Sequence, residues 1–214
     1  MANPRVAILG TGNVGGNLGV RFAQSEIGAV FGVREGGDPS ELLGRAGPGA
    51  SALPVAQAVA GADVVFLTVP ADVAVQAAGT AGNLSGKILV DCTNPVKFDA
   101  GGPVLAPPAG GSVAASLQAA YPGARMVKAF NGLGAEFHLD PNVAGKPADM
   151  FMAGDDPEAK KVVGALADRV GFRAIDARPV RNAAHLEAMA VVWIHLAVKG
   201  SMGRHFTFQL TPRA

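Results

Sequence analysis

The chain has 214 residues, of which 49% are hydrophobic and 16% charged, and its formal net charge at pH 7 is +1. This composition predicts a folded globular protein, and the near-zero charge without a Lys or Arg block argues against nucleic acid or an anionic membrane as the main partner. The single cysteine, Cys92, excludes an internal disulfide and a cysteine cluster for metal, so we expect no metal site and a cytoplasmic location. The N-terminus lacks a signal-peptide pattern, and the longest apolar stretch, Ala188–Ile194, is too short to span a bilayer.

The first predicted elements are a strand over 6–9 and a helix, joined by a glycine-rich turn. The turn reads Gly10-Thr11-Gly12-Asn13-Val14-Gly15, which is a G-x-G-x-x-G motif. In a dinucleotide-binding turn the first glycine allows the tight bend, the second lets a pyrophosphate approach the backbone, and the third lets helix and strand pack closely. The free N–H groups at the helix start then receive the anion. The position between a strand and a helix therefore predicts dinucleotide binding, with a chance glycine turn as the alternative.

The rest of the chain alternates between strand and helix patterns, as a doubly wound fold requires. Further strands are expected at 29–33, 64–69, 88–91, 125–130, 149–153 and 172–176, the last of which closes the sheet. Helices are expected at 39–45, 55–60, 71–81, 113–120, 156–170 and 181–199, with Gly/Pro-rich connections over 36–52 and 98–111. The fold class is therefore α/β, with a Rossmann-type, doubly wound, mostly parallel sheet and a helical C-terminal extension. We expect an NAD(P)-binding Rossmann domain over 1–180 and a C-terminal segment over 181–214.

The end of the second predicted strand selects between NAD and NADP. NAD-binding domains place Asp or Glu there, ~20 residues past the glycines, to bind the ribose 2′-OH. Here the segment reads Gly32-Val33-Arg34-Glu35, and an arginine at this point can bind a 2′-phosphate with two hydrogen bonds. The pattern favours NADP. Two alternatives remain: a shift of one or two residues would make Glu35 the ribose ligand, and Arg34 is otherwise an exposed surface arginine.

Several segments together resemble one known family. They are GTGNVGGNLGVRF, FGVRE, DVVFLTVP, DCTNPV, VKAFN and FMAGDDPEAKKVV, in chain order. Their order and spacing are similar to those of the NADP oxidoreductases that use the deazaflavin coenzyme F420, of their bacterial NADPH-dependent relatives, and of the reductase domains of some ferric reductases. The resemblance covers the chain from Val6 to about Gly203.

The resemblance also implies site residues. NADP would lie over the glycine turn, on Thr11, Gly12, Asn13 and Val14, with Arg34 on the 2′-phosphate and Val33 where the family has a serine. The remaining residues would border the ribose and nicotinamide: Val69, Pro70, Asn94, Ala129 and Asn131. Asn131 precedes a glycine, so a turn role is an equal alternative to a hydrogen bond with the nicotinamide amide.

The residues leave the catalytic group unknown. No Tyr-x-x-x-Lys motif and no recognisable Ser/His/Asp trio or carboxylate pair occurs, which agrees with direct hydride transfer to a flavin-like ring, since that step needs orientation and exclusion of water more than an acid or base. The predicted function is hydride transfer between NADP(H) and coenzyme F420, a flavin or another small acceptor. The alternatives are an NADP(H)-binding sensor without turnover and a reductase of small imines or 2-hydroxy acids.

The helix over 181–199 is apolar on two stripes, so it must be buried in a larger body. A homodimer interface through residues 181–200 is one explanation, and packing against the same chain's Rossmann core is the other. The acidic segment over 155–158 reads Asp-Asp-Pro-Glu, and Asp156, before Pro157, is expected to cap a helix. Cys92 is expected to fill apolar space.

Overall fold

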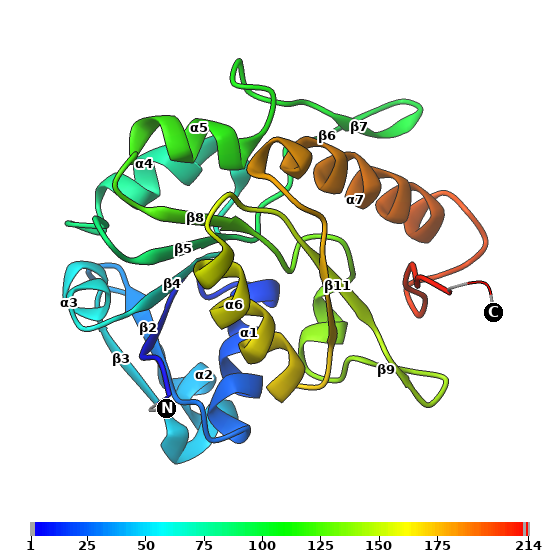
Figure 1. Ribbon diagram of the computed structural model, residues 1–214. Helices are drawn as coiled ribbons and strands as arrows, with labels where there is room; N and C mark the ends of the chain where they lie inside the picture. The colour runs from blue at the N-terminus through cyan, green and yellow to red at the C-terminus, as the bar shows by residue number, and fades with distance from the viewer. Residues whose placement is uncertain (1–2, 212, 214) are drawn as a thin grey trace.

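The main sheet of the computed structural model has six parallel strands in the order β3-β2-β1-β4-β5-β8. The structure describes residues 3–211 and 213 (Figure 1). The strands are β1 (Val6–Leu9), β2 (Ala29–Val33), β3 (Ala50–Pro54), β4 (Val64–Leu67), β5 (Ile88–Asp91) and β8 (Arg125–Lys128). The strand order reverses between β1 and β4, which confirms the doubly wound Rossmann arrangement.

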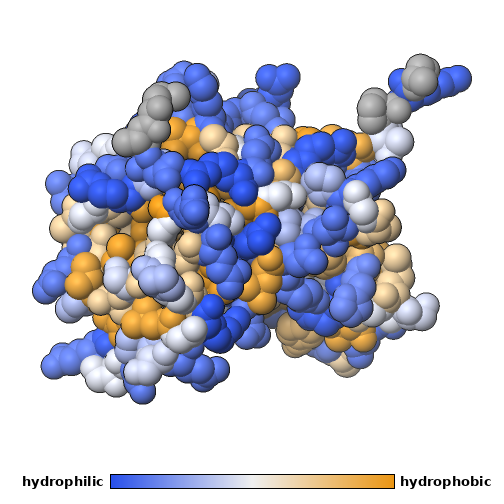
Figure 2. Space-filling model, turned by 90° about the horizontal axis from the view of Figure 1, so that it is seen from below, coloured by the Kyte–Doolittle hydropathy of each residue, from blue (hydrophilic) through white to orange (hydrophobic). Residues whose placement is uncertain are grey.

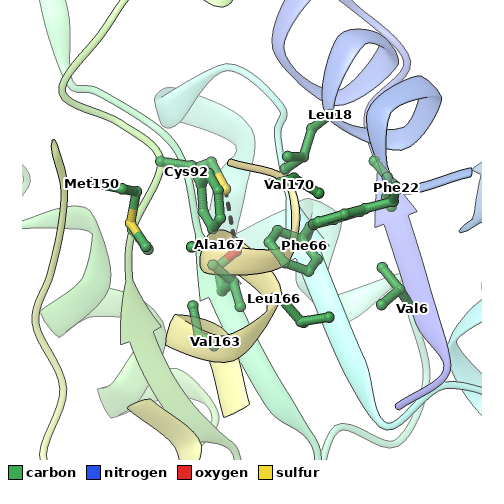
Figure 3. Close-up of a cluster of buried hydrophobic side chains, with 14 of the residues drawn as sticks. Val6, Leu18, Phe22, Phe66, Cys92, Met150, Val163, Leu166, Ala167 and Val170 are labelled. Carbon is green, nitrogen blue, oxygen red and sulfur yellow. Dashed lines mark hydrogen bonds between the residues drawn. The ribbon is translucent and has the colours of Figure 1, made fainter. Parts of the chain in front are cut away.

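Each face of the sheet has its own hydrophobic core, because successive side chains of a strand point to opposite faces. Ile8 and Phe66 point to the face covered by α1 (Asn13–Gln24) and α6 (Pro157–Arg169), whose packing is seen in Figure 3. Ala7 and Leu67 point to the opposite face. That face is covered by α3 (Val55–Ala60), α4 (Ala74–Gly79) and α5 (Val113–Ala120). Burial on both faces explains why the central strands read as unbroken apolar runs.

Local signals set the helix starts. Ser112 accepts a hydrogen bond from the Ala115 N–H and caps α5, and Asp156 accepts one from the Ala159 N–H and caps α6, with Pro157 as the first helical residue. The capping role expected for Asp156 is therefore confirmed. The short helix α2 (Ser40–Ala46) lies one residue from its expected range. The helix expected over 71–81 is a 3-10 turn, Ala71–Val73, followed by α4.

Three expectations about strands were wrong. The connection over 36–52 contains the start of the edge strand β3, which pairs with β2. The loop expected over 98–111 begins within an antiparallel hairpin of β6 (Val96–Asp99) and β7 (Gly102–Leu105). The strand expected to close the sheet, β12 (Arg173–Asp176), instead forms a separate parallel pair with β11 (Asp149–Met152), which meets β8 only through one antiparallel bridge between Lys128 and Ala153. A small hairpin, β9 (Asn142–Val143) with β10 (Lys146–Pro147), precedes this pair.

The C-terminal helix α7 (Ala183–Val198) packs against its own chain. Ala183, Leu186 and Trp193 are buried, and Ala183 and Trp193 join the cores on the two faces of the sheet. The β6–β7 hairpin lies alongside α7 (Figure 1). The tail then folds back, so that Phe206 stacks on Trp193 with ring centroids 5.3 Å apart. Of the two explanations for the apolar helix, packing against the same chain therefore accounts for its buried side.

The surface mixes polar and apolar side chains. Figure 2 shows hydrophobic residues interrupted by hydrophilic ones across the face seen from below. Within residues 3–211 and 213, none of the helices has the length and apolar character needed to cross a bilayer.

Candidate functional site

The glycine turn has the geometry that dinucleotide binding requires. Gly10 has φ +107°, which favours glycine, and a Cβ there would lie 2.6 Å from the Thr68 carbonyl oxygen. A Cβ at Gly15 would lie 2.0 Å from the Gly10 carbonyl oxygen, so the third glycine is needed for helix–strand packing. At Gly12, by contrast, nothing lies within 4 Å of the position that a Cβ would take, and this glycine is exposed. The backbone at Gly12 is therefore open to a ligand.

Helix α1 begins directly at this open position. Gly12 is its N-cap, no side chain caps the helix, and its first turn carries no acidic residue. The first intrahelical bond runs from the Gly16 N–H to the Gly12 carbonyl, so the N–H groups of the three residues before Gly16 have no acceptor within the helix. The turn at Thr11, Gly12 and Asn13 is exposed. The Thr68 hydroxyl donates to the Leu9 and Gly10 carbonyls at 2.9 and 2.8 Å and holds the turn against β4. An anionic pyrophosphate fits this arrangement.

An open groove lies beside the turn, at the ends of β2 and β3. It is lined by Val33, Arg34, Glu35, Gly37, Pro39, Ala52, Leu53 and Pro54, and its empty volume, part of it open to solvent, is about 780 Å³. Arg34 is exposed and makes no ion pair with any described residue. One side of the groove comes from the strand β3, which the sequence pattern missed because an exposed edge strand lacks a strong apolar signal.

The other predicted residues gather at the same edge of the sheet. Leu9, Leu67, Asp91 and Lys128 are in register at the strand ends, so the segments after β1, β4, β5 and β8 lie next to one another. Val69 and Asn94 are half-buried, Pro70 is exposed, and Ala129 is buried. The structure therefore brings the expected ribose and nicotinamide residues together with the glycine turn.

Asn94 and Asn131 hold two of these segments together. The Asn94 amide donates to the Asn131 carbonyl at 2.8 Å, and the Asn131 amide donates to Asn94 Oδ1 at 2.9 Å and to the Leu186 carbonyl at 3.1 Å. Asn131 is 5% exposed, so its two amide hydrogens serve the protein. Just before it, Phe130 has φ +59°, a conformation that non-glycine residues rarely adopt. The turn after β8 is thus tightly specified.

A buried charged cluster beneath these turns escaped the sequence reasoning. Lys128 Nζ donates to Asp91 Oδ2 and Glu187 Oε1, both at 2.9 Å, and to the Thr93 carbonyl oxygen. All three charged side chains are fully buried. Their signal in the sequence was weak, because Lys128 is 37 residues from Asp91 and 59 from Glu187. The polar end of an otherwise apolar strand and one Glu in an apolar helix were the only hints.

A narrow apolar cavity with about 10 Å³ of accessible space borders the same turn. It lies between the turn after β8, β11 and α7, and most of its lining is apolar: Phe130, Gly132, Leu133, Met150, Phe151, Leu186 and Met189, with Asn131 and Asp149. The carboxylate of Asp149 is already paired with Arg173. The cavity therefore offers apolar contact rather than an acid or base.

Two other groups near the site are inert by burial. Burial raises the pKa of the Cys92 thiol, so it stays protonated and fills apolar space, as expected. Burial also lowers the pKa of His138, whose ring nitrogens lie 3.1 Å from the Phe130 carbonyl and 3.2 Å from the Ala135 carbonyl. In the described part of the chain, no group of three or more His, Cys, Asp or Glu side chains is arranged to hold a metal ion.

The glycine turn at the strand reversal, the open helix start and the adjoining groove define the class of protein: a Rossmann-type dinucleotide-binding protein. A family model described as "NADP oxidoreductase coenzyme F420-dependent" matches residues 5–95. A solved structure of a candidate F420-dependent NADP reductase from Arthrobacter sp. FB24 is 30% identical, with a TM-score of 0.86, and the match covers 98% of this chain and 100% of that one. The chain belongs to this family of NADP-dependent oxidoreductases.

Two curated proteins are also similar to it. The F420-dependent NADP reductase of Methanothermobacter thermautotrophicus is 29% identical over 209 residues, which cover 91% of this chain and 90% of that protein. The metalloreductase STEAP3 of Rattus norvegicus is 29% identical over 186 residues, which cover 87% of this chain. The chain spans only 36% of the length of STEAP3, so the similarity covers about a third of that protein.

Proposed function

We propose that this protein transfers a hydride between NADP(H) and a flavin-like acceptor, such as a flavin or coenzyme F420. The observation that carries the proposal is the open backbone at Gly12 beside a groove that ends at the exposed Arg34. Family membership supports NADP, and the names of two relatives supply the acceptor class.

Different segments along the sheet edge would bind different parts of the dinucleotide. The N–H groups at the start of α1 would hold the pyrophosphate, and the groove at β2 and β3 would hold the adenosine with its 2′-phosphate against Arg34. The nicotinamide would then lie across the strand reversal, toward Val69, Asn94 and the turn at Asn131. Val33 supplies no hydroxyl, so Arg34 would carry the 2′-phosphate contact without a serine partner.

Hydride transfer needs little more from the protein than this placement. When bound, the nicotinamide supplies or accepts the hydride at its ring carbon 4. The paired amides of Asn94 and Asn131 would keep the ring-side turns rigid, and the apolar lining at Leu133, Leu186 and Met189 would exclude water. The cavity there has only about 10 Å³ of accessible space, room for at most one water molecule, so an acceptor ring would lie over this lining and not inside it.

Nucleotide choice is tested by Arg34→Ala and Glu35→Ala. Loss of a charged hydrogen bond to the 2′-phosphate should weaken NADPH by about 1–3 kcal/mol, while NADH changes little. Glu35→Ala is the matched control, and it should leave the preference for NADPH intact. If Glu35→Ala weakens NADH and Arg34→Ala changes neither nucleotide, the ribose ligand is Glu35 and the NADP assignment at this position is wrong.

The acceptor is tested by NADPH oxidation with FMN, coenzyme F420, a small cyclic imine and a 2-keto acid in turn. Steady oxidation with a flavin or deazaflavin supports the proposal. Turnover with the imine or keto acid would identify the alternative reductase, and tight NADPH binding without turnover on any acceptor would favour the sensor.

We further propose a homodimer through the outer side of α7 and the hairpin beside it. Val192 is 51%, Val198 53% and Phe98 64% exposed, so this side of the molecule presents several large apolar side chains to solvent. The double variant Val192→Glu/Val198→Glu should convert a dimer to a monomer in light scattering. The control Val75→Glu changes an exposed valine of α4, outside the proposed interface, and should not. A monomeric parent protein would contradict the proposal. The cytoplasmic location stays a prediction, supported by the single, buried cysteine.

A further inference from the structure

The buried cluster of Lys128, Asp91 and Glu187 joins two strands of the main sheet to the C-terminal helix α7. Asp91 ends β5, Lys128 ends β8, and Glu187 belongs to the second turn of α7. All three side chains are fully buried, and the lysine uses its three N–H donors within the cluster. Truncating Lys128 would leave two buried carboxyl groups without their cation, so the cluster is strongly coupled.

The cluster also holds the backbone of both turns on the nicotinamide side. Lys128 Nζ donates to the Thr93 carbonyl, and Asp91 Oδ1 accepts from the Thr93 N–H at 2.9 Å. One residue before Glu187, the Leu186 carbonyl accepts from the Asn131 amide. One turn of α7 is therefore bonded to the base of the turn after β5 and to the turn after β8.

We infer that Lys128 and Glu187 are positioning residues, through which α7 sets the turns that receive the nicotinamide half of the dinucleotide. The inference rests on the proposed function, since it needs NADP(H) across the strand reversal. The adenosine half is independent of the cluster, because the groove with Arg34 lies at the opposite end of the sheet edge, at β2 and β3.

The charge of the cluster indicates which substitution should be tolerated. One ammonium faces two carboxyl groups, and Glu187 Oε2 is buried without a hydrogen-bond partner. Glu187 Oε1 accepts from both Lys128 and the Val113 N–H, the latter at 3.0 Å. Burial raises the pKa of Glu187, so a neutral side chain that keeps one oxygen should serve in its place. Glutamine meets this requirement, and leucine of similar size does not.

The test compares binding of NADPH with binding of 2′-phospho-ADP-ribose, which lacks nicotinamide, by titration calorimetry. The dissociation constant of 2′-phospho-ADP-ribose divided by that of NADPH measures the contribution of the nicotinamide half. In Glu187→Leu this ratio should fall at least fivefold, while the affinity for 2′-phospho-ADP-ribose stays within twofold. Glu187→Gln should restore the parent ratio. Glu187→Asp, which withdraws the carboxylate by one methylene, gives the same readout if the leucine variant does not fold.

A matched control separates positioning from general loss of stability. Leu117→Ala removes a fully buried side chain of α5 that makes no bond to either turn, and it should leave the ratio unchanged. The inference is overturned if Glu187→Leu or Glu187→Asp keeps the parent ratio, if Leu117→Ala lowers it equally, or if the parent ratio itself is near one. Failure of the parent to bind either ligand would instead overturn the proposed function.

Discussion

Gly12→Ala and Gly15→Ala should separate ligand binding from folding within a single turn. Gly12 has φ −73° and ψ −166°, an extended conformation open to any residue, and nothing lies within 4 Å of the new methyl group. Alanine gains ~0.4–1 kcal/mol by restricting the unfolded chain and loses a similar amount as a poorer N-cap than glycine. The free energy of unfolding should therefore change by less than ~0.5 kcal/mol.

Gly15→Ala meets the opposite surroundings. Its methyl carbon would lie 2.0 Å from the Gly10 carbonyl oxygen and 2.2 Å from Thr68 Oγ1, both held by hydrogen bonds or backbone geometry. Helix α1 must move away from the strand ends, and overpacking of this kind costs ~1–3 kcal/mol. For a chain of this size, that corresponds to a fall of roughly 2–12 °C in Tm.

Urea unfolding and NADPH titration on both variants provide the assay. Gly12→Ala should keep the parent's unfolding midpoint and bind NADPH at least tenfold more weakly, or about 1.4 kcal/mol, because the methyl group occupies the path of the pyrophosphate. Gly15→Ala should lower the midpoint. Undiminished NADPH binding by Gly12→Ala, or an unchanged midpoint in Gly15→Ala, would refute the reasoning from the geometry of the turn.

Three further variants or reagents test the buried and capping groups. Because burial lowers the pKa of His138, its contribution to stability is present above the ordinary value of 6.5 and is lost as pH falls below it. His138→Phe should remove up to ~1.4 kcal/mol per pH unit of that slope in urea unfolding from pH 7 to 5, and an identical slope would contradict this. Asp156 pairs with Arg125 and caps α6, which lowers its pKa to about 2. Asp156→Ala should cost ~1–2 kcal/mol at pH 7, and Asp156→Asn should cost less because asparagine can still cap the helix. The difference in stability between the parent and Asp156→Asn should vanish as pH falls from about 4 to 2, and an Asp156→Asn variant as stable as the parent at pH 7 would show that the charge is irrelevant. Cys92 should react with iodoacetamide only when urea unfolds the chain, as followed by mass spectrometry; fast labelling of the native protein would contradict its burial.

Local sequence patterns were enough to predict the glycine turn, the order of most strands and helices, and the cap at Asp156. Each of these depends on residues close together in the chain: a glycine at a fixed offset, an unbroken apolar run buried on both faces, or an aspartate before a proline. Arg34, which lines the groove, was predicted as a candidate in the same way, because the end of the second strand follows the glycines at a regular distance.

The tertiary structure alone decided the features that depend on distant partners. The edge strand β3 exists through its pairing with β2, the hairpin β6–β7 lies against α7, and β11 and β12 pair with each other instead of closing the main sheet. Lys128 and Glu187 meet across 59 residues, which no local pattern encodes. A strand with weak apolar character or a charge in an apolar helix is stable only when the fold supplies its partner, because an unpaired backbone edge or buried charge is costly. The candidate binding residues could therefore be predicted from the sequence, whereas the contacts that hold them in place required the folded molecule.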